Sequence, residues 1–261
     1  MMNIITQPYY TLDFSVAACN FEILVNDIPV ITMESEGQIS TNIPINYAIY
    51  KSGEQFITAN IKPLAGTENL HPDASLKFNV RLYDVANNDF KRINDYEEVK
   101  LPQVEENQKV PFLTQETEFV AEIPYSLINW NNGENLKDVD DIKEKVIQAY
   151  NNLANLLKEE KYAEFAEKIS VREKNMATSM YLTSSESKAR INSLIDDAKN
   201  GFDVMPLPKS IFKFYGYGKL VTLKKLNGEP AFYLYNKETK EELMIDQMLY
   251  MPKGKTELEI I

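Results

Sequence analysis

The chain has 261 residues, of which 44% are hydrophobic and 26% are charged, and its formal net charge at pH 7 is −11. Such a composition is typical of a globular protein, and no segment reaches the roughly 18 consecutive apolar residues of a membrane-spanning helix. The excess of acid argues against nucleic-acid binding, because phosphates require Lys and Arg. The first residues lack the basic and apolar segments of a signal peptide, so we expect a cytoplasmic protein.

The charge is distributed unevenly along the chain. Residues 1–130 contain 18 acidic and 8 basic residues, a net charge of −10, whereas the remainder contains 21 and 20, a net charge of −1. The hydrophobic pattern also changes near residue 131, from the alternation of strands to the periodicity of helices. We therefore predict two domains, 1–130 and 137–261, joined by a linker at 131–136. We expect the acidic domain to select the partners.

Short apolar runs separated by turn signals dominate the first 130 residues. Phe21–Val25 and Ile28–Met33 flank Asn26-Asp27, two residues that tolerate the positive φ of a tight hairpin turn. Similar runs follow at 43–50, 55–61, 76–83 and 118–123, with turn signals at 52–53, 63–72 and Asn87-Asn88. Without helical periodicity between them, such runs predict an antiparallel β-sandwich.

Acidic residues crowd the segment from 89 to 118, which Pro102 and Pro111 interrupt. One interpretation is a solvated edge that keeps the sheet from pairing with another chain. The other is a docking surface for a basic protein, since acidic patches speed the association of such partners. The candidate docking residues are Glu97, Glu98, Glu105 and Glu106.

Three helical segments are predicted after the linker. The first begins at Asp138, a good N-cap, and apolar residues then recur every three or four positions over 139–157. The second spans Tyr162–Met180. The third begins with Thr183-Ser-Ser-Glu186, the pattern of a capping box, in which hydroxyl and carboxylate bond to each other's backbone amides.

Arg172 and Glu173 occupy the position where the apolar stripe of the second helix should continue. Either the helix bends or exposes this position near Ser170, or the two side chains supply polar groups to an internal pocket. The pocket interpretation makes Glu173 a candidate acid or base.

The chain returns to strands after residue 208. We predict a four-stranded antiparallel meander at 211–217, 219–226, 231–235 and 243–251, in which Asn227-Gly228 is a hairpin turn. Alternation places phenylalanines and leucines on the face toward the helices. The opposite face carries Tyr215, Tyr217, Tyr233 and Tyr235. A tyrosine face suits an interface, either with the first domain or with a second copy of the chain.

The order of these elements over residues 137–261, helices and then a curved antiparallel sheet, resembles the cone-shaped fold of nuclear transport factor 2-like proteins. The resemblance implies an α+β domain of a family that includes small-molecule isomerases and dehydratases as well as non-enzymatic binding domains. Enzymes of this fold commonly use Asp, His or Tyr inside the cone. This half contains no His and offers only Arg172, Glu173 and the sheet tyrosines. The first half resembles the β-sandwich accessory domains of bacterial proteins.

Catalytic and metal-binding motifs are not evident in the sequence. The chain has one His, His71, and one Cys, Cys19, and neither lies in a hydrolase motif. No HExxH sequence, phosphate-binding Gly-rich loop or EF-hand spacing occurs, so we expect no metal and no cofactor. An enzyme is therefore the less favoured class.

Three functions fit these patterns. The first is a non-enzymatic cytoplasmic protein that binds a basic protein partner, as an immunity or inhibitor protein does when it neutralises a toxin. The second is small-molecule binding, or isomerase- or dehydratase-type catalysis, in the C-terminal cone. The third is a structural component that forms a homo-oligomer through its tyrosines.

Overall fold

The computed structural model describes residues 5–86 and 89–261, so the turn expected at Asn87-Asn88 lies outside the described residues. The chain divides into two compact units, residues 1–126 and 127–261, which are described separately below. The first unit consists of strands and the second combines four helices with short strands. The fold is thus a mixture of helices and antiparallel sheets.

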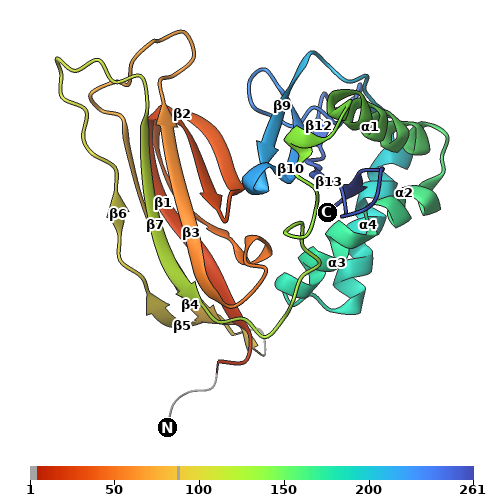
Figure 1. Cartoon of the computed structure of the whole chain (residues 1–261), viewed down its shortest axis with the longest axis horizontal. Helices are drawn as coiled ribbons and strands as arrows, with labels where there is room; N and C mark the ends of the chain where they lie inside the picture. Colours follow the sequence, from red (N-terminus) through yellow and green to blue (C-terminus); the bar gives the residue numbers. More distant parts are fainter. Residues whose placement is uncertain (1–4, 87–88) are drawn as a thin grey trace. The chain divides into compact units, whose positions relative to one another are not determined.

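Seven strands of the first unit form one antiparallel sheet, in the order β5-β4-β1-β3-β7, with β2 beside β1 and β6 beside β4 (Figure 1). The 3-10 helix η1 (Asn46–Ala48) follows β2. The strands are β1 (Pro8–Val25), β2 (Ile28–Pro44), β3 (Gly53–Lys62), β4 (Ser75–Asp84), β5 (Lys91–Asp95), β6 (Val99–Lys100) and β7 (Leu113–Ala121).

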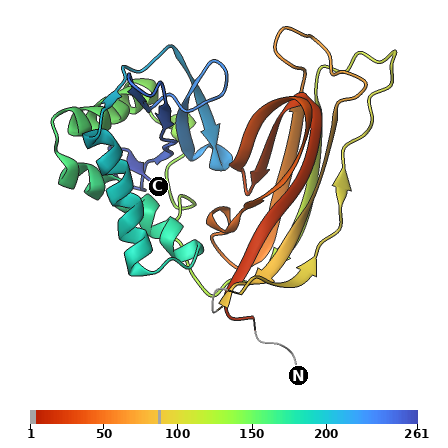
Figure 2. The same ribbon diagram turned by 180° about the vertical axis from the view of Figure 1, so that it is seen from behind.

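The long hairpin of β1 and β2 organises this sheet. Its turn is Asn26-Asp27, with φ of 53° and 60°, as the sequence predicts. The first half of β1 pairs with β4 and its second half with β3, while the register against β2 shifts at Ala18, where φ is 50°. Such a bulge increases the local twist, so the sheet curls (Figure 2). Hydrogen bonds join all seven strands into this one sheet, and a division into two face-to-face layers stays a prediction.

The core of the first unit comes from alternate residues of the sheet. Phe14, Phe21 and Phe78 are buried, and the rings of Phe14 and Phe21 lie 5.4 Å apart. A hydrogen bond joins residues far apart in the sequence, since the Tyr10 hydroxyl of β1 accepts from the Glu122 N–H, just after β7, at 2.8 Å. Cys19 is fully buried, and burial raises the pKa of its thiol to about 11.

Four helices follow in the second unit, where the sequence predicts three. They are α1 (Ile142–Lys158), α2 (Tyr162–Lys168), α3 (Ser170–Ser179) and α4 (Ser184–Lys199). The expected start at Asp138 is wrong, because residues 136–138 form a separate 3-10 turn, η3 (Leu136–Asp138), and Asp141 then adopts a positive φ of 55°. The segment 162–180 is broken at Ile169 into α2 and α3.

The capping box before α4 is confirmed. Thr183 Oγ1 accepts from the Glu186 N–H at 3.3 Å, and Glu186 Oε2 accepts from the Thr183 N–H at 2.7 Å. Among the described helices, none combines the length and the apolar composition that a bilayer crossing demands.

The strands of the second unit form two small antiparallel sheets rather than the single predicted meander. One has the order β14-β13-β10-β9 and the other β12-β11-β8, and η4 (Gly216–Gly218) follows β9. The strands are β8 (Phe202–Val204), β9 (Ser210–Tyr215), β10 (Leu220–Lys225), β11 (Tyr233–Asn236), β12 (Glu242–Met244), β13 (Leu249–Tyr250) and β14 (Glu259–Ile260).

The predicted meander divides after the Asn227-Gly228 turn. The turn forms, since the Gly228 N–H donates to the Lys225 carbonyl at 3.0 Å. Pairing then stops at one bridge, Lys224 to Pro230. On either side of that bridge the Lys225 N–H donates to the Glu229 carbonyl at 2.7 Å and the Ala231 N–H donates to the Leu223 carbonyl at 3.1 Å. Beyond it, β11 pairs with β8 and β12 in the other sheet.

One apolar face of α1 packs on both small sheets. Val146, Tyr150 and Leu153 of α1 are buried in the same cluster as Leu223 of β10 and Leu234 of β11. Trp130, the only tryptophan, is also buried, near the start of the unit. The second unit therefore has a core of its own.

Candidate functional site

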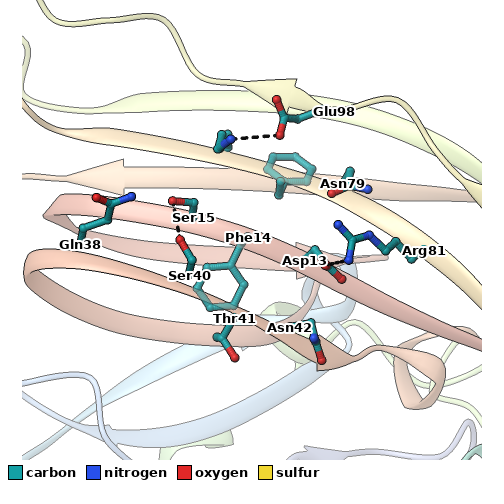
Figure 3. Close-up of a pocket in the computed structure, with 12 residues that line it drawn as sticks. Asp13, Phe14, Ser15, Gln38, Ser40, Thr41, Asn42, Asn79, Arg81 and Glu98 are labelled. Atoms are coloured by element: carbon teal, nitrogen blue, oxygen red, sulfur yellow. Dashed lines mark hydrogen bonds and ion pairs between the residues drawn. The ribbon is translucent and has the colours of Figure 1, made fainter. Parts of the chain in front are cut away.

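A polar groove of about 420 Å³ lies on the sheet of the first unit, over β1, β2 and β4 (Figure 3). Hydroxyl and amide side chains predominate in its lining. The lining residues are Asp13, Phe14, Ser15, Gln38, Ser40, Thr41, Asn42, Lys77, Phe78, Asn79, Arg81 and Glu98. Because it gathers hydroxyl, amide and charged side chains from three strands, we take this groove as the candidate binding site.

Strand register builds the groove from two cross-strand rows. Asn42, Asp13 and Asn79 are direct neighbours in one row. Ser40, Ser15 and Lys77 form the next row, in which the Ser40 hydroxyl donates to Ser15 Oγ at 2.9 Å. Because residues two apart share a face of a strand, both rows lie on the same side of the sheet. The sheet therefore supplies a fixed set of hydrogen-bonding groups.

The charged groups at the groove pair with one another. Arg81 forms an ion pair with Asp13, and the Lys77 ammonium lies 3.3 Å from Glu98 (Figure 3). Hydrogen bonds from Lys100 and Lys77 hold the pKa of the Glu98 carboxyl below its ordinary value. Two cations thus balance two carboxylates inside the groove. A ligand there would meet amides, hydroxyls and backbone rather than a net charge.

The four predicted docking glutamates are separated by this arrangement. Only Glu98 lines the groove, and its charge is already neutralised. Glu97, Glu105 and Glu106 are exposed, and their carboxylates make no ion pair with any residue that the structure describes. Three exposed carboxylates without an ion pair therefore lie close together in the sequence on either side of β6.

The four predicted tyrosines do not share one sheet. Tyr215 ends β9 and is buried, whereas Tyr217 lies in η4 and is 60% exposed. Tyr233 and Tyr235 are half-buried on β11, in the other sheet, and the Lys225 ammonium lies 4.1 Å from the centre of the Tyr233 ring. The continuous tyrosine face of the predicted meander is therefore wrong.

Arg172 and Glu173 lie within the second unit. The break before Ser170 exists, yet Glu173 is only 2% exposed. Its Oε2 accepts from Arg190 Nε of α4 at 3.1 Å, and its Oε1 lies 3.4 Å from Arg172 Nη1. Burial lowers the pKa of Arg172, and the charge of Glu173 opposes this shift. The cluster joins α3 to α4, and Arg190 leaves Glu173 poorly placed to act as a free base.

A buried hydroxyl network in the second unit was not expected from the sequence. Tyr150 Oη donates to the Gln247 carbonyl at 2.7 Å, accepts from the Leu223 N–H at 3.1 Å, and lies 3.1 Å from Thr222 Oγ1. Burial raises the pKa of Tyr150, so its hydroxyl stays protonated. The Gln247 side-chain amide is buried and has no hydrogen-bond partner among the described residues.

The groove was also missed, although the sequence carries a signal for it. Asp13 and Ser15 alternate with buried Leu12, Phe14 and Val16 along β1. This alternation predicts a half-buried strand with a polar outer face. The alternation does not show which strands pair with β1. Because the groove also needs residues of β2 and β4, it could not be predicted from β1 alone.

Comparisons with known proteins leave the site without a relative. No protein-family model matches the chain, and neither a curated protein nor a solved structure matches it. Over residues 5–86 and 89–261, no group of three or more His, Cys, Asp or Glu side chains is placed to hold a metal ion. The function must therefore be inferred from the chemistry of this chain alone.

Proposed function

We propose that the chain is a non-enzymatic, cytoplasmic protein-binding protein whose acidic first unit engages a basic protein, as an immunity or inhibitor protein engages its target. The observation that carries this proposal is the unpaired, exposed acid at Glu97, Glu105 and Glu106. Neighbouring carboxylates such as Asp95 and Glu98 already have cationic partners. The free carboxylates are the ones that keep their charge for a partner.

The net charge supports the same proposal. With 18 acidic and 8 basic residues before position 131, the first unit carries a charge of −10. A field of one sign steers an oppositely charged protein and raises its association rate, and salt weakens this effect. We therefore expect a complex whose stability falls as ionic strength rises.

We further propose that the units are separate domains, at 1–130 and 137–261, and that the first is a sandwich closed by the curl of its sheet. Each unit has a core of its own, which supports this division. The likeness of the second unit to nuclear transport factor 2-like proteins, and of the first to bacterial β-sandwich accessory domains, stays part of this proposal.

The test compares the affinity for the partner of the wild-type protein with that of a variant that lacks the three unpaired carboxylates. The tagged protein is used to purify its partner from native cytosol at low salt, and the dissociation constant is then measured. Changing Glu97, Glu105 and Glu106 together to Gln should weaken binding at least tenfold at low salt and flatten the salt dependence. The matched control changes exposed Glu167, Glu238 and Glu257 to Gln, an equal change in net charge on the second unit. Equal affinities of the two triple variants would contradict the proposal.

Small-molecule binding by the second unit is the second candidate. The observation that favours it is the buried side-chain amide of Gln247, which lacks a partner among the described residues. The backbone carbonyl of the same residue accepts from Tyr150. A polar ligand could satisfy such an amide. This candidate ranks second because the expected acid or base, Glu173, is neutralised by Arg190.

A further inference from the structure

Strand β2 is a long edge of the first sheet. It spans 17 residues and pairs with β1, and no other described strand pairs with it. One side of its backbone is therefore not used by the sheet. An edge of this kind can accept an added strand from another protein.

Hydrogen bonds at the end of the hairpin show which residues direct their backbone outward. The Tyr10 N–H donates to Asn46 Oδ1 at 2.6 Å, and its carbonyl accepts from the Ile45 N–H at 3.0 Å. Even-numbered residues of this half of β1 therefore face β2, and their partners there are Ile39, Thr41 and Ile43. Because direction alternates along a strand, the residues between them face away from β1. These outward residues are Gln38, Ser40 and Asn42.

The outward residues are also those that supply the groove. Gln38, Ser40 and Asn42 are exposed, and their side chains line it. A strand added at β2 would thus find backbone donors and acceptors at the edge and polar side chains beside it. Two separate features, the unused edge and the groove, meet at the same three residues.

The usual protections of an edge are absent from residues 38–42 of β2, which lie beyond the bulge and contain no charge and no proline. Its only prolines are Pro29 and Pro44, near its two ends, and it contains no Lys or Arg. Natural edges are commonly blocked by an inward or central charge, by proline or by shortness. Its charged residues, Glu34 and Glu36, are both acidic.

We propose that β2 binds an extended basic segment of a protein partner as an added strand along residues 38–42. The inference rests on the proposed function and deepens it by naming how the partner is held. Charge selects this occupant, because a second copy would bring another unit of charge −10 against the first. A segment rich in Lys or Arg instead complements Glu34 and Glu36 of β2 and the net charge of the unit.

A matched pair of variants at one position tests the proposal. Ser40→Pro removes an outward N–H and leaves the ladder to β1 intact, whereas Ser40→Ala keeps the N–H and loses the same hydroxyl. The probe is an immobilised library of ten-residue peptides in which every second residue is Lys or Arg. We expect wild type and Ser40→Ala to retain peptides with similar affinity, and Ser40→Pro to bind them at least tenfold more weakly.

A second measurement leaves the protein unchanged. The best peptide is resynthesised with N-methyl groups on alternate amides, in the two possible phases. In an added strand, only alternate N–H groups of the peptide face β2. Methylating that set should abolish binding, and methylating the other set should leave binding unchanged. Equal effects in both phases, no retained peptide, or equal binding by the two Ser40 variants would overturn the proposal. Self-association lost in Ser40→Pro would overturn it in favour of a second copy.

The two proposals fail in different ways. A partner from cytosol that binds Ser40→Pro normally, but not the variant of Glu97, Glu105 and Glu106, would overturn strand addition and leave the proposed function standing. If the partner is lost only in Ser40→Pro, strand addition at β2 stands and the proposed role of Glu97, Glu105 and Glu106 is contradicted.

Discussion

The two units use similar lengths of chain in opposite ways. The first builds one sheet from strands as long as 18 residues, whereas no strand of the second exceeds six. The second instead gathers short strands around α1 and balances its charges, as in the pair of Lys224 with Asp246. The first keeps an excess of acid and a long free edge. The comparison indicates that the second unit balances its charges internally, whereas the first leaves acidic residues and a strand edge available to a partner.

The largest expected effect is a loss of stability that is confined to the core of the first unit. Phe78→Ala removes a buried ring of β4 and should destabilise the first unit by about 3–5 kcal/mol. Hydrogen exchange followed by mass spectrometry should show faster exchange over residues 8–121 and little change over 142–260. Phe112→Ala, at an exposed ring of the same unit, is the control and should have little effect. Faster exchange throughout the chain would show that the units unfold together.

An intermediate effect is expected from the ion pair of the second unit. Glu173→Ala leaves Arg172 and Arg190 without their shared carboxylate, and should cost about 1.5–3 kcal/mol, the range for a hydrogen bond to a charged group. Urea denaturation measures this cost. Glu167→Ala, an exposed glutamate of α2, serves as the control. A cost equal to that of the control would show that α3 and α4 are held together by their apolar contacts.

The smallest effect is a pH dependence in the first unit. Slight burial acts in the opposite direction, yet hydrogen bonds from the backbone of Gln7, Thr6 and Ala86 lower the pKa of Asp84 below its ordinary 3.8. The stabilisation is therefore present above that value and is lost as pH falls through the lowered pKa. In Asp84→Asn, stability should fall less between pH 6 and pH 3 than in wild type, measured by urea denaturation. Parallel curves for the two proteins would contradict this.

Local signals in the sequence predicted local structure well. The turn at Asn26-Asp27 and the capping box at Thr183 depend on neighbouring residues, so the sequence is sufficient to find them. The mixture of helices and antiparallel strands was also predictable from periodicity. Arg172 and Glu173 stood out because they interrupt an apolar stripe.

Features that depend on distant partners were not predictable. The sequence could not show that Glu173 meets Arg190, or that β11 would pair with β8 and β12 in another sheet. The groove required the register of three strands, and the tyrosine face failed because its strands were divided between two sheets. In each case the missing information was pairing across the fold.

Cys19 and Trp130 are each the only residue of their kind, and they are buried in different units. A thiol reagent reaches Cys19 only when the first unit opens, since burial shields the sulfur and keeps it protonated. Indole fluorescence responds when the surroundings of Trp130 change in the second unit. The unaltered chain thus contains one native reporter in each half. Following both signals through a single urea titration would reveal whether the halves open in concert or in sequence.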